Sequence, residues 1–253
     1  MLYNAIYGDY IGNDSTSVNK IVVKLGTSTV LNTDLSIDWN VLKHLAEDIN
    51  NMRNRGINSI IVTSGARGLG NKKGVKDART SAGVGQYELM HGYSEIFAAH
   101  GIIVEQILLE SAHFRLGAIN NFSRAVADAW SEGVLPIINE NDPMATEKTT
   151  FGDNDKLARM AAEAIGAQMV VFFSTQNSAM NKARGKGGAK SKMNEIKKLQ
   201  RQNILVRLVD GKESHALKKA FEGDDISGQL NIDRLKEIAR KHDSAAAIRK
   251  IKS

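Results

Sequence analysis

Short apolar runs alternate with longer segments of helical periodicity along most of this chain. The runs predict strands, because they are rich in Ile, Val, Leu and Phe and most are followed by small or polar residues. These expected strands cover residues 21–25, 59–63, 102–109, 134–138, 169–173 and 204–209. The segments between them predict helices over 86–100, 121–132, 154–165, 192–202, 214–220 and 232–241. A further helix before Gly56 has one apolar face, formed by Val41, Leu42, Leu45, Ile49 and Met52.

This alternation predicts an α/β fold, in which right-handed βαβ units build a mostly parallel central sheet with helices on both faces. The 253 residues, 42% of them hydrophobic, suit one domain over residues 21–253. Residues 1–20 are polar, show little periodicity and are expected to form a loose extension. The segment 174–190 is rich in Gly and Lys, and we expect it to be weakly structured.

Two polar clusters follow expected strands or begin expected helices. Asn139-Glu140-Asn141-Asp142 follows the run 134–138, and Gly152-Asp153-Asn154-Asp155 leads into the helix 154–165. Ligands of parallel sheets bind at the carboxyl ends of strands, where such side chains can hold a polar substrate or order nearby lysines. Ordinary turn and cap chemistry explains either cluster alone about equally well. Both clusters together favour a site.

Two basic features are suited to phosphate. Lys24 ends the first expected strand just before Gly26, where glycine lets the backbone approach a ligand. The Gly- and Lys-rich stretch 185–192 leads into a helix with Lys192 in its first turn, and helix N-termini favour anions. The alternatives are a strand-end lysine that reaches into solvent and a solvated loop. The chain has neither a Walker loop nor a G-x-G-x-x-G motif.

Composition narrows the class of partner. The formal net charge of +6 suits an anionic ligand such as a nucleotide. Nucleic acid is not expected as a partner, since the basic run 182–198 has no interleaved aromatic residues to stack on bases. The six histidines lack metal-ligand spacing, so no protein-held metal is expected. The lack of cysteine favours a cytoplasmic protein, and no run is long and apolar enough to suggest a membrane span.

Seven motifs stand in the order found in glutamate 5-kinases, which belong to the amino acid kinase superfamily. They occupy residues 22–28, 63–66, 84–86, 106–109, 136–142, 152–157 and 185–192. The chain therefore resembles that family over roughly residues 20–230. The resemblance implies a three-layer αβα sandwich. It also implies ATP-dependent phosphorylation of the γ-carboxylate of L-glutamate to an acyl phosphate, as in the first step of proline biosynthesis.

The resemblance also implies roles for individual residues. Lys24 and Lys192 would hold the transferring phosphoryl group, and Asp155 would order both lysines. The amino acid would be bound by Ser64, Gly65, Asn139, Asp142 and Asn154. The nucleotide would be bound by Lys24, Gly26, Ser174, Thr175, Lys186, Gly187, Gly188 and Lys192. ATP would carry Mg²⁺ on its own oxygens, and the protein would form a homo-oligomer.

The chain departs from the family pattern near the nucleotide. Thr175 stands where the family has a nucleotide-contacting aspartate, and the segment before the glycine-rich loop is shortened. The family's C-terminal RNA-binding-like PUA domain is also not recognised. A second interpretation is therefore a catalytically impaired kinase-like protein that binds an amino acid or has a regulatory role. The presence of both lysines and Asp155 favours the enzyme.

Overall fold

The computed structural model describes residues 18–115, 117–175 and 189–222. Its six strands form one sheet in the order β3-β4-β2-β1-β5-β6, and every pairing between these neighbours is parallel. The strands are β1 (Lys20–Leu25), β2 (Asn58–Val62), β3 (Val104–Leu109), β4 (Leu135–Glu140), β5 (Met169–Ser174) and β6 (Leu205–Asp210). All six expected strands are therefore confirmed, with ends that differ by one or two residues.

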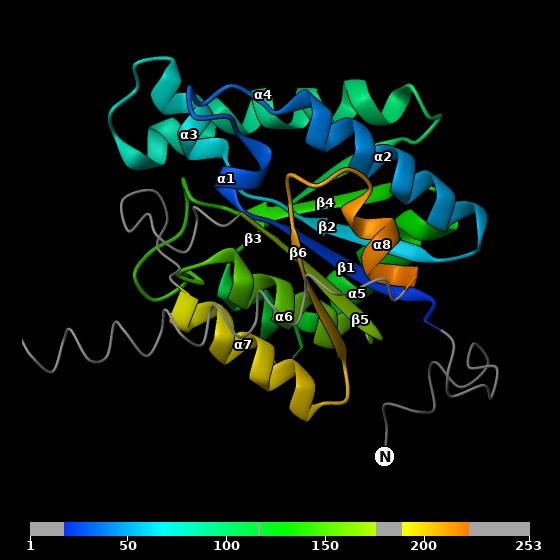
Figure 1. Ribbon diagram of the computed structural model, residues 1–253. Coiled ribbons are helices and arrows are strands. Elements are labelled where there is room, and N and C mark those ends of the chain that lie inside the picture. The colour runs from blue at the N-terminus through cyan, green and yellow to red at the C-terminus, as the bar shows by residue number, and fades with distance from the viewer. Residues whose placement is uncertain (1–17, 116, 176–188, 223–253) are drawn as a thin grey trace, which may run out of the picture.

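Helices cover both faces of the sheet (Figure 1). One layer contains α2 (Trp39–Asn54), α3 (Ala66–Lys72), α4 (Ala78–Ala98) and α8 (Ala216–Glu222). The other contains α5 (Ile119–Ser131), α6 (Asn154–Ile165) and α7 (Ala189–Arg201). Two short elements, α1 (Thr27–Val30) and η1 (Ser111–Phe114), follow β1 and β3. This arrangement confirms the three-layer αβα sandwich.

The central strand β1 shows why its sequence is apolar throughout. Ile21, Val23 and Leu25 pack into the core beneath α2, α4 and α8, whereas Val22 packs into the core beneath α5, α6 and α7. All four side chains are fully buried. Burying one such side chain stabilises the fold by roughly 1.5–3 kcal/mol, so a strand covered on both faces keeps no polar alternation.

Three expectations about the elements were wrong. The fourth strand continues through Asn139 and Glu140, so these two residues belong to the strand and not to the loop after it. Helix α4 begins at Ala78 rather than Gln86, because the Asp77 carboxylate caps it by accepting from the Thr80 N–H at 2.8 Å. Helices α1 and α3 and the turn η1 were not expected at all. Short helices at strand ends have too few residues to show a period.

Helix α3 owes its place to glycines. Gly65 begins it with φ +116°, a conformation that other residues rarely adopt. A Cβ on Gly85 of α4 would lie 1.8 Å from the Ala66 carbonyl oxygen. A Cβ on Gly70 of α3 would lie 1.9 Å from the Ser81 carbonyl oxygen. The two helices therefore pack backbone against backbone.

Parts of the expected organisation lie outside the described residues. These are most of the extension 1–20, most of the segment 174–190 and the expected last helix over 232–241. Within the described ranges, no helix combines the length and apolar character of a membrane span.

Candidate active site

Two buried lysines meet one buried carboxylate at the carboxyl end of the sheet. Lys24 comes from β1, Asp155 from the first turn of α6 and Lys192 from the first turn of α7. The Lys24 Nζ lies 2.6 Å from Asp155 Oδ1, and the Lys192 Nζ lies 2.9 Å from the same oxygen. The exposed fractions of these residues are 7%, 4% and 9%, respectively. The structure thus brings together the three residues that the sequence assigned to catalysis.

This cluster carries more positive than negative charge. Burial acts to raise the pKa of Asp155, but the charges of Lys192 and Lys24 outweigh it and hold that pKa well below its usual range. Burial lowers the pKa of Lys192 to about 8, although Asp155 opposes the shift. The Lys192 ammonium also lies 5.1 Å from the centre of the Phe172 ring. Two ammonium groups around one carboxylate leave a net positive charge that an anion can neutralise.

The first turns of α6 and α7 are tied to each other. The Asp153 carboxylate accepts from the Lys156 N–H at 2.8 Å, which caps α6, and also from the Ser191 hydroxyl on α7. One turn further along, Arg159 donates to Glu195 at 2.5 Å across the same two helices. These contacts fix the position of Lys192 relative to Asp155.

Asn154 joins three polar groups beside the lysine cluster. Its Nδ2 donates to the Thr63 carbonyl at 2.6 Å and to Asn139 Oδ1 at 2.8 Å, and it lies 3.0 Å from Ser64 Oγ. Because a backbone carbonyl only accepts, the amide must be oriented with Nδ2 toward Thr63. Within the described part of the chain, the buried Oδ1 of Asn154 then has no hydrogen-bond partner. It is an acceptor aimed at something other than these residues.

The amide chain continues through residues to which no role was assigned from the sequence. The Asn139 Nδ2 donates to Gln86 Oε1 at 2.9 Å, and the Gln86 Nε2 donates to Gln106 Oε1 at 2.9 Å. Glu140 is buried and accepts from the Phe151 N–H at 2.9 Å, which holds the loop before α6 against β4. Both glutamines stand in motifs shared with glutamate 5-kinases, 84–86 and 106–109, and a glutamine inside an apolar strand was a further signal for Gln106.

A pocket of about 310 Å³ opens beside this amide chain. Its wall includes Asp142 and Glu140, together with Gln86, Gln106 and apolar residues. Asp142 lies just beyond the end of β4, as the sequence indicated. The lining is Ala66, Ala82, Gly83, Gln86, Tyr87, Met90, Gln106, Leu108, Glu140, Asp142 and Pro143. Its volume suits a small-molecule ligand, and its two carboxylates and two amides supply polar contacts.

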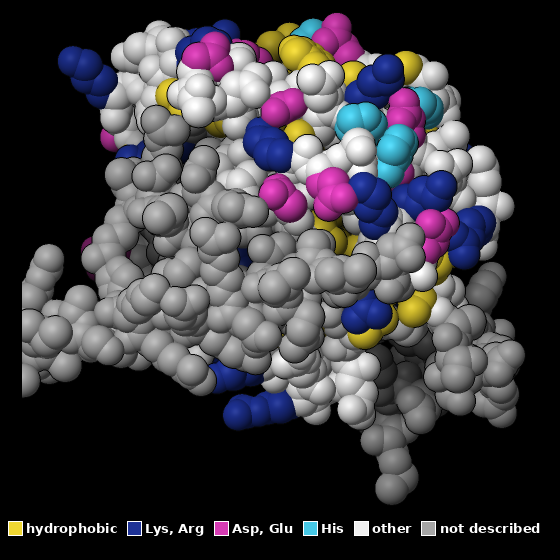
Figure 2. Space-filling model, in the orientation of Figure 1, with side chains coloured by type: hydrophobic (Ala, Val, Ile, Leu, Met, Phe, Trp, Pro, Cys, Tyr) yellow, Lys and Arg dark blue, Asp and Glu magenta, His cyan; other side chains and the backbone are white. Residues whose placement is uncertain are grey.

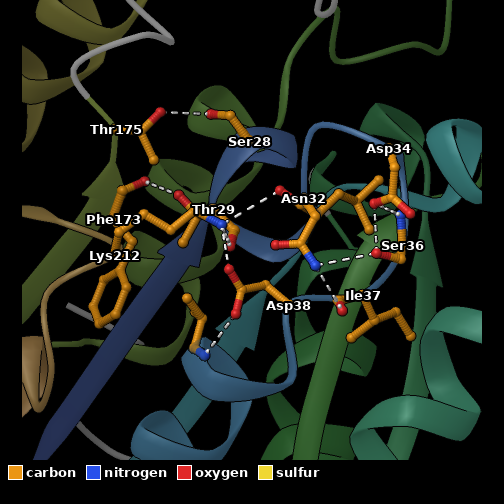
Figure 3. Close-up of polar contacts among 12 residues, drawn as sticks. Ser28, Thr29, Asn32, Asp34, Ser36, Ile37, Asp38, Phe173, Thr175 and Lys212 are labelled. Atoms are coloured by element: carbon orange, nitrogen blue, oxygen red, sulfur yellow. Dashed lines mark hydrogen bonds and ion pairs between the residues drawn. The ribbon is translucent and has the colours of Figure 1, made fainter.

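The ends of β1 and β5 meet on the other side of Lys24. The Thr175 hydroxyl donates to Ser28 Oγ at 2.9 Å, and the Thr29 hydroxyl donates to the Phe173 carbonyl at 3.4 Å (Figure 3). The Ser174 carbonyl accepts from the Gly211 N–H at 3.0 Å.

Gly26 begins α1, and a Cβ added there would lie 3.8 Å from the Lys24 Nζ. The other nucleotide residues expected from the sequence, Lys186, Gly187 and Gly188, lie outside the described residues. The structure therefore places Gly26, Ser174 and Thr175 at adjoining strand ends, but it leaves the glycine-rich loop untested.

Comparison with known proteins agrees with this architecture. The model of the amino acid kinase family matches residues 19–197. A glutamate 5-kinase of Clostridium acetobutylicum is 34% identical over 185 residues, which cover 66% of this chain and 68% of the relative. A glutamate 5-kinase of Alkaliphilus metalliredigens is 30% identical over 247 residues, which cover 81% of this chain and 92% of the relative.

Solved structures share the fold at low sequence identity. Isopentenyl phosphate kinase superposes with a TM-score of 0.59 at 14% identity, covering 82% of this chain and 97% of that one. UMP kinase from Ureaplasma parvum superposes with a TM-score of 0.56 at 11% identity. The superposition covers 83% of this chain and 97% of the UMP kinase chain. Fold, motif order and family match lead to one conclusion. The chain belongs to the amino acid kinase family and, within it, is similar to glutamate 5-kinases.

Proposed function

We propose that this protein is a phosphotransferase that transfers the γ-phosphoryl group of ATP to the γ-carboxylate of L-glutamate. The observation that carries the proposal is the convergence of Lys24 and Lys192 on a single oxygen of Asp155. Three buried charges cost free energy to desolvate, so a fold keeps such a cluster most readily where it meets a charged ligand. The similarity to glutamate 5-kinases supports a carboxylate as the acceptor and a place in proline biosynthesis.

The reaction requires positioning and charge neutralisation more than proton transfer. A carboxylate oxygen of the substrate attacks the γ-phosphorus, the bond to the bridging oxygen breaks, and its electron pair leaves with ADP. A glutamate side chain has an ordinary pKa of about 4.3, so it is already ionised at pH 7 and needs no general base. The ammonium groups of Lys24 and Lys192 are held where they can stabilise negative charge on the transferring group.

Recognition of an amino acid is supported by the amide and carboxylate groups around the pocket. An α-ammonium group is a donor that pairs well with a carboxylate, and Asp142 lines the pocket. Asn154 is not part of the pocket wall, but it is joined to it through Asn139 and Gln86, and its buried Oδ1 has no partner among the described residues. A buried acceptor without a partner costs roughly 1–3 kcal/mol, so a ligand donor that reached this oxygen would be favoured.

The residues present also fit ATP with Mg²⁺. Lys24, Lys192 and the backbone around Gly26 would hold phosphate oxygens. Both lysines contact Asp155 Oδ1, which leaves that oxygen poorly placed to bind a cation as well. Magnesium would therefore be held mainly by ATP, where it neutralises phosphate charge.

A turnover assay tests the proposal. ADP release would be measured with ATP and a panel of L-glutamate, L-aspartate and acidic analogues that lack the α-amino group. We expect ADP release with L-glutamate and much less with the analogues. Calorimetric binding of glutamate without turnover would favour the alternative of a kinase-like binding protein. Turnover with an acceptor that lacks a carboxylate would overturn the assignment of substrate class.

A further inference from the structure

Two histidines and a glutamate gather on the helical layer opposite α6 and α7. His44 and Glu47 lie one turn apart on α2, and His215 precedes α8. One possible ligand atom from each residue lies within 4.8 Å of those of the other two. The two imidazole ring centres are 4.8 Å apart. Histidine and acidic side chains are seen to gather over α2 and α8 in Figure 2.

A buried carboxylate orients one of these rings. Asp48 is 1% exposed, and its Oδ1 lies 2.8 Å from the Nδ1 of His215. Its other oxygen accepts from the Lys218 N–H at 3.1 Å, so the carboxylate is fixed from two sides. A neutral His215 that donates from Nδ1 to Asp48 presents the lone pair of Nε2 outward. Histidine ligands of zinc are commonly held this way by a carboxylate.

We propose that His44, Glu47 and His215 bind one divalent transition-metal ion of the zinc class. Two imidazoles and a carboxylate are ligands that Zn²⁺ accepts, and a fourth position would remain for water. Bonds of about 2.0–2.1 Å place tetrahedral ligand atoms roughly 3.3 Å apart. The His215 Nε2 already lies 3.6 Å from a Glu47 oxygen. Small side-chain rotations would bring the rest of the set to this spacing.

The proposed metal site is open to solvent and includes a residue of the loop that joins β6 to α8. The side chains of His215 and Glu47 are 42% and 29% exposed, so an ion can enter from solvent. His215 has φ +52°, a strained conformation for a residue other than glycine. The same loop carries Lys212, whose Nζ donates to the Thr29 carbonyl at 3.0 Å and lies 2.7 Å from the Asp38 carboxylate (Figure 3). A metal ion would therefore fasten the loop after β6 to α2.

Metal binding by the full chain tests this inference directly. Protein freed of metal with a chelator would be titrated with Zn²⁺ in the absence of nucleotide, and bound zinc would be counted after equilibrium dialysis. The variants are His44→Ala and Glu47→Gln, both on the partly exposed face of α2. The matched control is His91→Ala, which removes a histidine that lies 3.6 Å from Glu95 on α4 and that, among the described residues, belongs to no metal-ligand cluster. Far-UV circular dichroism would establish that each variant is folded.

We expect one zinc ion per chain in the wild type and in His91→Ala, with binding at least tenfold weaker in His44→Ala and Glu47→Gln. Co²⁺ should give a visible absorption spectrum that Zn²⁺ abolishes, and this spectrum should be lost in the two site variants. Zinc should also raise the melting temperature of the wild type and of the control, but not of the site variants. Equal zinc binding by the wild type and both folded site variants would overturn the proposal, as would no stoichiometric binding at all.

Discussion

Asn154 and Asp155 are neighbours at the start of α6, yet their side chains serve two different parts of the site. Asn154 contacts Thr63 and Asn139, whereas Asp155 contacts the two lysines. Successive residues of a helix point about 100° apart, so one turn can fix an amino-acid half and a phosphoryl half relative to each other. We therefore propose that the first turn of α6 aligns the two substrates.

Removing either lysine should abolish most of the transfer activity. Lys24→Ala and Lys192→Ala should each lower kcat by about 10²–10³, because each removes a positive charge next to the transferring group. Lys197→Ala is the matched control, since Lys197 is an exposed lysine on the same helix. Steady-state kinetics and thermal melts of the three variants would be compared. Wild-type kcat in a folded Lys192→Ala protein would remove that residue from the mechanism.

The depressed pKa of Lys192 should appear in the pH profile. Below pH 8 the ammonium is charged, and above it the charge is lost, so kcat/KM of the free enzyme should fall on the alkaline side with an apparent pKa of about 8. The residual activity of Lys192→Arg should lack this limb, because a guanidinium stays protonated. A wild-type profile that is flat between pH 7 and 10 would contradict the assignment.

Lys192 should also make the stability of the fold depend on pH, but stability should rise with pH where kcat/KM falls. Its folded pKa of about 8 lies below its ordinary value of 10.5, so the unfolded chain binds more protons between these values. The contribution of Lys192 to the free energy of unfolding should therefore rise as the pH increases from about 8 to about 10.5. Urea denaturation of the wild type and of Lys192→Met across this range would isolate this contribution. The free energy of unfolding of the wild type minus that of Lys192→Met should increase as the pH rises. A difference that is constant across the range would show that Lys192 keeps an ordinary pKa.

Asp142 should act on the amino acid rather than on the nucleotide. Asp142→Asn removes the negative charge that would pair with the α-ammonium group, and we expect KM for glutamate to rise about tenfold or more with KM for ATP nearly unchanged. Asn141→Ala, at the preceding position, is the control and should leave both values close to wild type. If KM for ATP rose instead, Asp142 would have to be assigned to the nucleotide subsite and not to the amino-acid subsite.

The close packing of α3 on α4 makes a prediction about stability. Gly85→Ala would place a Cβ 1.8 Å from the Ala66 carbonyl oxygen, so the helices must separate. We expect a loss of about 1–3 kcal/mol or more in the free energy of unfolding. In Gly83→Ala on the same helix, the one neighbour of the new Cβ within the described part of the chain is the Pro143 side chain, at 3.4 Å. This variant should be neutral or stabilising because alanine favours helix. Equal stability of the two variants in chemical denaturation would contradict this packing.

The sequence was sufficient for the sheet and for the lysine cluster. Continuous apolar runs predict strands that are buried on both faces, such as β1 and β5. The motif residues Lys24, Asp155 and Lys192 lie at strand or helix ends, so the parallel topology alone brings them to one edge.

Other parts of the structure depend on contacts between distant segments. The chain from Asn139 through Gln86 to Gln106 joins β4, α4 and β3, and no local pattern indicates that these amides meet. The same is true of His44 and His215, which were scattered histidines in the sequence. Helix α3 was missed because the contacts that fix it are close backbone approaches to α4, at Gly70 of α3 and Gly85 of α4. All these contacts join residues that are far apart in the sequence, and a single sequence does not show which distant residues lie close together in the fold.

The central claim is acyl phosphate formation at the site around Lys24, Asp155 and Lys192. Hydroxylamine added to the reaction would trap an acyl phosphate as a hydroxamate, with release of phosphate, and the product would be identified by mass spectrometry. With ATP, Mg²⁺ and L-glutamate, we predict γ-glutamyl hydroxamate in amounts equal to the ADP released, with wild-type yield from Lys197→Ala and almost none from Lys192→Ala. ADP formation without hydroxamate, or equal hydroxamate from Lys192→Ala, would contradict the account.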